Sequence, residues 1–278
     1  MNNIQLSNST VVFASTLALL TAFSSATPAR SQSGAIATPP SSVSIRFQPP
    51  AALPPPPVVN DPGDGRSQGG AGRRSCLLAL VPQVGTKATY WGLTTTARPT
   101  FWFHLTEQFD PSIPIKLTLR DRSGQSIYTT TLSAPNTPSI VISAPIPTSA
   151  PALQVNTAYS WDVTYRCKSG TRVPKNPDEF VDLDDDRPIA VITGGIQRIA
   201  PSSTLQRQIR SAKTPLDRAT LYANNGIWYD SLTTLGQQVQ GKKPVDSAIV
   251  RAWFDLLRQA NLQPSASTPV AACCKPTE

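Results

Sequence analysis

Residues 158–167, which read AYSWDVTYRC, alternate strictly between two kinds of side chain. Every second position from Tyr159 to Cys167 is aromatic or otherwise apolar, and the positions between them are polar or charged. A period of two is typical of a β-strand with one buried face. Because that face carries two Tyr, a Trp and a Cys, we predict that this strand lies in the centre of a sheet and not at its edge.

Six further segments have the composition of short strands. They are residues 76–81, 100–107, 115–121, 125–132, 139–143 and 189–199. The tripeptide Arg122-Ser123-Gly124 predicts a hairpin turn between two of them. Gly194-Gly195 predicts a bulge or a close backbone approach within the last one. Short strands without helical periodicity between them favour a mainly β protein with some α, in which residues 76–200 form an antiparallel, immunoglobulin-like β-sandwich.

The apolar period changes after residue 200, and residues 201–262 predict a small helical module. Ser203 with Gln206 has the pattern of a capping box, and Thr214 followed by Pro215 is a second helix start signal. We expect three or four short helices, and one small helical unit of this kind cannot bury its own apolar face. We therefore expect the module to pack on or beside the sandwich.

The later helices of this module carry four aromatic side chains on their apolar stripes. These are Trp228, Tyr229, Trp253 and Phe254. Such side chains form either a core or an interaction surface, and the pattern leaves both readings open. Residues 263–278 are predicted to be a disordered tail.

The N-terminal residues have the features of an exported protein. An apolar run at residues 11–23 has the length of a secretory signal and is too short to span a membrane, so we predict a signal peptide at residues 1–26. A buried helix is the alternative. Export would place the mature chain in the periplasm or outside the cell, without a transmembrane span. Residues 27–75 are rich in Pro and Gly and predict a disordered linker.

In an exported protein, Cys76 and Cys167 are expected to form a disulfide, because one opens the first predicted strand and the other closes the central one. The alternative is two buried thiols that behave as small hydrophobes. Cys273 and Cys274 lie in the predicted tail, where exchange, pairing between chains and an inert role all remain open.

Aspartates in the acidic segment 178–186 are the strongest candidates for a metal site. Asp182, Asp184 and Asp186 match the first three ligand positions of a calcium-binding loop, although Arg187 stands where that loop requires Gly. A solvated acidic loop is the alternative interpretation. The same carboxylates could serve a hydrolase, but nothing in the sequence places two of them across a cleft.

Other chemistry finds little support in the sequence. The net charge of +8 is spread along the chain, which argues against a nucleic-acid groove. His104 is the only His, and no phosphate loop, dinucleotide fingerprint or zinc spacing is present. We therefore predict no catalytic residue and no required cofactor.

Several short motifs occur in an order that resembles a known family. They read RRSCLLALVPQ, ARPTFWFHL, LTLRDRSGQSIY, YSWDVTYRC, GGIQRI and NNGIWYDSL, and they span residues 73–262. In this order they resemble the secreted cyanobacterial family named domain of unknown function (DUF) 928. The resemblance implies export in a cyanobacterium, and it implies no catalytic or binding residue.

These observations favour a non-enzymatic interaction module of the cell envelope, which binds a protein or an anionic polysaccharide. The predicted linker and the missing catalytic set motivate this expectation. A hydrolase that uses the acidic segment and a calcium-stabilised adhesion module are the alternatives.

Overall fold

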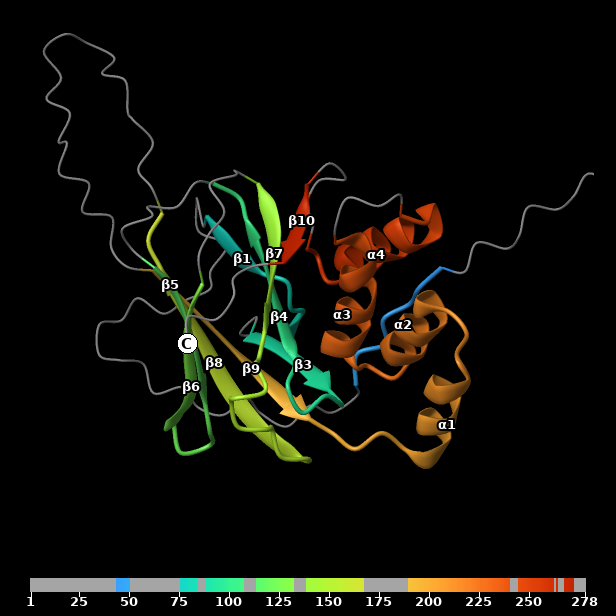
Figure 1. Cartoon of the computed structure of the whole chain (residues 1–278), viewed down its shortest axis with the longest axis horizontal. Helices are drawn as coiled ribbons and strands as arrows, with labels where there is room; N and C mark the ends of the chain where they lie inside the picture. The colour runs from blue at the N-terminus through green and yellow to red at the C-terminus, as the bar shows by residue number, and fades with distance from the viewer. Residues whose placement is uncertain are drawn as a thin grey trace, which may run out of the picture. The chain divides into compact units, whose positions relative to one another are not determined.

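The structure, a computed structural model, describes two sheets and a group of helices on one side of them (Figure 1). All of the described residues belong to one compact unit, Ser42–Glu278. They are residues 44–50, 76–84, 89–107, 114–132, 139–167, 190–240, 245–262, 264 and 268–272.

The smaller sheet has four strands. In spatial order they are β1 (Leu77–Ala79), β4 (Thr100–Leu105), β7 (Ile140–Pro145) and β10 (Val270–Ala272). β4 pairs antiparallel with both β1 and β7, whereas β10 pairs parallel with β7. The tail that we predicted to be disordered from residue 263 therefore contains a short edge strand.

The larger sheet has six strands. In spatial order they are β2 (Gln83–Val84), β3 (Thr89–Thr94), β9 (Ala190–Arg198), β8 (Thr157–Tyr165), β5 (Ile115–Arg120) and β6 (Ser126–Leu132). β3 and β9 are parallel, and the other neighbours are antiparallel. Both sheets are therefore mixed, so the prediction of antiparallel sheets is wrong. The mainly β class is confirmed, and the immunoglobulin-like layout is not.

All seven predicted strands are present, and the predicted central strand is β8, which lies between β9 and β5. Sequence reasoning missed β2, β3 and β10. β2 and β10 are too short to show a period, and β3 is buried on both faces, so it does not alternate. The hairpin predicted at Arg122–Gly124 joins β5 and β6, and Gly124 adopts a φ of 82°.

The two sheets meet around the indole ring of Trp161 on β8. This ring lies 5.9 Å from the ring of Phe101 and 6.4 Å from that of Phe103, both on β4. Gly194 on β9 lies beneath it, where a Cβ atom would come within 2.2 Å of the indole. An added Cβ atom at Gly195 would come within 1.9 Å of Trp91. Of the two predictions for Gly194-Gly195, the close backbone approach is therefore the one that the structure contains.

Cys76 and Cys167 form the predicted disulfide, with 2.11 Å between their sulfur atoms. Cys76 precedes β1 in the smaller sheet, and Cys167 follows β8 in the larger one. The bond thus links the two sheets across a sequence separation of 91 residues.

The helical segment folds into α1 (Ser203–Ser211), α2 (Pro215–Asn224), α3 (Trp228–Val239) and α4 (Ser247–Gln259). The Thr214 capping box is confirmed, with Pro215 at the first helical position. The capping box predicted at Ser203 is wrong by one residue, because the side chain of Ser202 accepts the bond from the backbone N–H of Leu205.

Helices α3 and α4 pack on the sheets through aromatic side chains. The Trp161 indole N–H donates to the Tyr229 hydroxyl over 3.1 Å, and the Trp228 indole N–H donates to the Leu80 carbonyl over 2.8 Å. On α4, the ring of Trp253 lies edge-on to that of Trp102, with 5.4 Å between centroids. The helices therefore share one hydrophobic core with the sheets.

Residues 44–50 lie within the predicted linker, yet they pack on the helices. Ile45 is 1% exposed, and the backbone N–H of Gln48 donates to the carbonyl of Ala223 at the end of α2. This part of the segment is therefore ordered, contrary to the prediction. Among the described residues, no helix is both long and apolar enough to cross a membrane.

We expect replacement of Cys76 and Cys167 by Ser to lower the free energy of unfolding by about 4 to 5 kcal/mol, because the bond closes a long loop in the unfolded chain. Chemical denaturation in the oxidised state measures this difference. Cys273 and Cys274 are replaced by Ser in both proteins as the matched background. Equal midpoints for the two proteins would contradict the prediction.

Candidate functional site

A polar pocket of about 250 Å³ lies where the loop between β3 and β4 meets α2 and α3. Most of its lining side chains carry hydroxyl groups, and one Arg and one Asp also line it. The principal members are Thr94, Thr96, Arg98, Tyr222, Asp230 and Thr233. We call this site the Thr-Arg pocket.

Asp230 fixes the wall of the Thr-Arg pocket. It lies in the first turn of α3, is 6% exposed, and accepts four hydrogen bonds from the last residue of β3 and the loop that follows it. One carboxylate oxygen accepts from the Thr94 hydroxyl (2.6 Å) and the Thr95 N–H (3.1 Å), and the other accepts from the hydroxyls of Thr95 (2.6 Å) and Thr96 (3.0 Å). Because all four donors point at one buried carboxylate, the loop is held firmly and the charge of Asp230 is satisfied.

Arginine side chains surround the same loop. Arg98 donates from Nε to the carbonyl of Ala150 over 3.2 Å. Arg198 donates from Nε to the carbonyl of Thr95 over 3.2 Å and from Nη1 to that of Leu153 over 2.6 Å. The acceptors in these bonds are neutral carbonyl groups. They fix the orientation of each guanidinium but do not neutralise its positive charge.

Tyr222 on α2 closes the other side of the Thr-Arg pocket. Burial raises the pKa of its hydroxyl, and the negative charge of Asp230 raises it further, while Thr95 and Arg218 act in the opposite direction. The phenol is therefore neutral at physiological pH and can donate a hydrogen bond.

The lining of the Thr-Arg pocket has the chemistry of a polar binding site. Hydroxyl donors and acceptors beside guanidinium groups can hold a polar, negatively charged ligand. His104, the only His, lies on β4 with its Nε2 atom 3.4 Å from the Ser139 hydroxyl and is absent from the lining of the pocket. Within the described part of the chain, no group of three or more His, Cys, Asp or Glu side chains could hold a metal ion.

The residues predicted from sequence lie elsewhere. Asp182, Asp184 and Asp186 fall outside the described residues, so the calcium and hydrolase hypotheses stay predictions. The structure places Trp228, Tyr229 and Trp253 in the core, at 0%, 2% and 1% exposed, which is one of the two readings that the sequence left open. Phe254 is half-buried.

Sequence reasoning missed the Thr-Arg pocket altogether. Asp230 was the feature of the sequence that could have indicated it. This charged residue stands among the apolar residues of NNGIWYDSL, on a helix face that is otherwise buried. A buried carboxylate requires donors, and the run of three Thr at 94–96 supplies them.

These features define a β-rich protein of two mixed sheets with helices packed on them. The sequence matches the family described as Domain of Unknown Function (DUF928) over residues 62–270, which is most of the chain, and the protein belongs to that family. No curated protein and no solved structure matches it.

Asp230→Ala should lower the free energy of unfolding by about 2 to 4 kcal/mol, because it leaves several partly buried donors without an acceptor. Asp230→Asn should cost less, since one carbonyl oxygen remains. Thermal or denaturant unfolding measures both. Asp255→Ala, which removes a partly exposed pair with Arg258, is the matched control and should change stability by less than about 1 kcal/mol. An Asp230→Ala protein as stable as this control would contradict the prediction, because the hydrogen bonds of Asp230 would then contribute nothing to the free energy of unfolding.

His104 predicts a pH dependence of stability. Burial lowers the pKa of this His below its ordinary value of 6.5, so the unfolded chain binds a proton more readily than the folded chain. The free energy of unfolding should therefore fall as the pH decreases from 6.5 toward the lower folded-state pKa. Denaturant unfolding between pH 5 and 7 measures the slope, and His104→Gln should flatten it. An unchanged slope in His104→Gln would contradict the assignment, since the chain has no other His.

Proposed function

We propose that the protein is an exported, non-enzymatic interaction module of the cell envelope, and that it binds an anionic glycan in the Thr-Arg pocket. The observation that carries this proposal is a hydroxyl-lined pocket in which Arg98 donates to a backbone carbonyl and not to a carboxylate, and in which Asp230, the only carboxylate among the described lining residues, is already bonded to the Thr side chains. Since Asp230 already accepts four hydrogen bonds, it repels an anionic ligand less than a free carboxylate would.

The size and chemistry of the Thr-Arg pocket support a saccharide. A volume of about 250 Å³ suits one or two sugar rings better than a folded partner. Thr and Tyr hydroxyls can exchange hydrogen bonds with sugar hydroxyls, and Arg98 can pair with a carboxylate or sulfate group.

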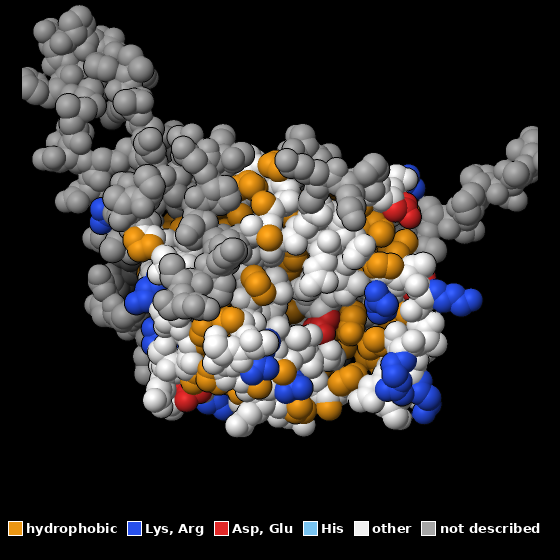
Figure 2. All heavy atoms as spheres, in the orientation of Figure 1, with side chains coloured by type: hydrophobic (Ala, Val, Ile, Leu, Met, Phe, Trp, Pro, Cys, Tyr) orange, Lys and Arg blue, Asp and Glu red, His pale blue; other side chains and the backbone are white. Residues whose placement is uncertain are grey.

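Surface charge supports the same class of ligand. Figure 2 shows Lys and Arg side chains gathered over α1 and few acidic side chains on this face. Arg207 and Arg210 of α1 are exposed, and Lys213 follows them before α2 begins. Such a surface attracts a polyanion at long range, and its effect weakens as salt rises.

The proposal is tested by titrating the protein with oligogalacturonate, a uronic-acid saccharide, and with a neutral galactose oligomer of the same length. Calorimetry should detect binding of the acidic oligomer only. Arg98→Ala should weaken that binding about tenfold, the loss expected for one charge-assisted hydrogen bond. Arg98→Lys should retain part of the affinity.

Arg122→Ala is the matched control, because Arg122 is exposed in the turn between β5 and β6 and neither strand lines the pocket. This variant should bind as the unmodified protein does. Equal binding of acidic and neutral oligomers, or equal losses in Arg98→Ala and Arg122→Ala, would contradict a specific anionic site.

A further inference from the structure

Residues 44–50 lie across the helices as an extended peptide would lie in a groove. Their side chains alternate: Ile45 is buried and Phe47 half-buried, whereas Ser44, Arg46 and Gln48 are exposed. A period of two along an extended segment means that one face is held and the other is free.

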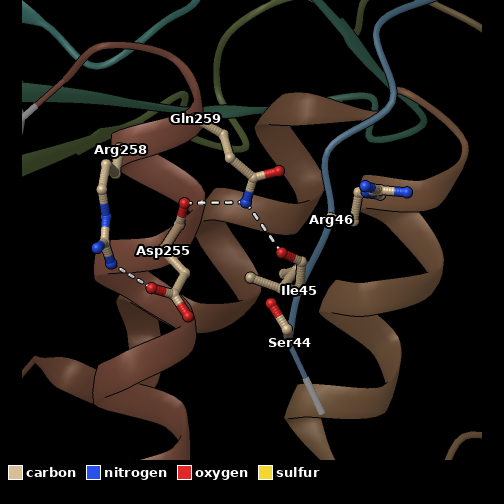
Figure 3. Close-up of a pocket in the computed structure, with 6 residues that line it drawn as sticks. All are labelled: Ser44, Ile45, Arg46, Asp255, Arg258 and Gln259. Atoms are coloured by element: carbon tan, nitrogen blue, oxygen red, sulfur yellow. Dashed lines mark hydrogen bonds and ion pairs between the residues drawn. The ribbon is translucent and has the colours of Figure 1, made fainter. Parts of the chain in front are cut away.

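Gln259 at the end of α4 clamps the backbone of this segment. Its side-chain amide donates from Nε2 to the carbonyl of Ile45 over 2.9 Å, and its Oε1 accepts from the N–H of Phe47, also over 2.9 Å. Figure 3 shows the amide between the Asp255 carbonyl of its own helix and Ile45, while Arg46 points to the other side of the segment. The clamp contacts backbone atoms only, so it recognises an extended chain rather than a particular side chain.

Specificity comes from the apolar side chains on the held face. The ring of Phe47 packs edge-on against Trp228 of α3, with 4.9 Å between centroids. Pro50 lies over Gly226, where φ is 70° and an added Cβ atom would come within 2.8 Å of both Pro50 and the carbonyl of Gln48. The groove thus requires Gly226 and fits an aliphatic, an aromatic and a Pro side chain at set positions.

Contact between the segment and α4 is incomplete. A hollow of about 370 Å³ remains between them, lined by Ser44, Arg46, Asp255 and Arg258 in addition to Ile45 and Gln259. The segment is therefore held through Ile45, Phe47 and its backbone, and the side that faces this hollow is not packed against α4. A segment with one face held and one face free can be replaced by the same segment of another chain.

We propose that this groove is a peptide-binding site, and that it accepts residues 44–50 from a second copy of the chain as well as from its own. The 25 residues between Pro50 and Cys76 could extend to about 80 Å, long enough to reach a neighbouring copy. Within one copy the covalent connection keeps the segment at a high local concentration, so dilute chains occupy their own grooves. Exchange between copies becomes favourable where one copy has an empty groove or the copies are concentrated.

Two complementary full-length variants test this proposal. Ile45→Ser with Phe47→Ser weakens the segment and leaves the groove intact, whereas Gln259→Ala weakens the groove and leaves the segment intact. Sedimentation of an equimolar mixture should reveal heterodimers, at least about tenfold tighter than the self-association of either variant, since the clamp contributes two hydrogen bonds. Gln208→Ala, on the exposed face of α1, is the matched control for Gln259→Ala and should give no more heterodimer than the unmodified chain.

A second measurement covers the case in which the doubly substituted variant does not fold. A protease site inserted within residues 63–69 of the otherwise unmodified chain allows the tether to be cut after folding. The cut N-terminal piece should stay bound, a labelled synthetic peptide of residues 43–50 should displace it, and Gln259→Ala should speed its release. Immediate loss of the cut piece, or a mixture of folded variants that contains monomers only, would overturn the proposal.

Discussion

The indole of Trp161 is the contact on which the rest of the structure depends. It touches Phe101 and Phe103 across the two sheets, and it donates a hydrogen bond to Tyr229 on the helices. Gly194 provides the space beneath the ring. Because one side chain joins three layers, a change in its position would alter the sheet packing and the seat of α3 together.

The Thr-Arg pocket depends on that arrangement. Tyr229 and Asp230 are neighbours at the start of α3, so the hydrogen bond that seats Tyr229 also sets where Asp230 meets the loop after β3. Asp230 in turn fixes the loop that positions the Thr hydroxyls and carries Arg98. The hydrophobic core thereby fixes the geometry of the polar site, although the core side chains contribute none of its polar groups.

The parts that sequence analysis predicted are those with a local signal. Strict alternation placed β8 in the centre of a sheet, and Thr214 with Pro215 located the start of α2. The parallel pairing of β3 with β9 has no such signal, because the two strands are about 100 residues apart in the chain. The same reason hid the pocket: Thr94 and Asp230 are 136 residues apart, and only the fold brings them together. The order of residues 44–50 was not predicted, because the abundance of Pro around Ile45 and Phe47 favours a disordered segment when only composition is considered.

The position of the disulfide has a mechanical consequence. A force applied at the N-terminal end of the chain would first pull residues 44–50 away from the helices and would then reach Cys76. Without the sulfur bridge, that load would fall on β1, a three-residue edge strand that is easily stripped away. With it, the load divides between β1 and the end of β8, which is flanked by a strand on each side. Both sheets therefore bear a force that is applied from the N-terminal side.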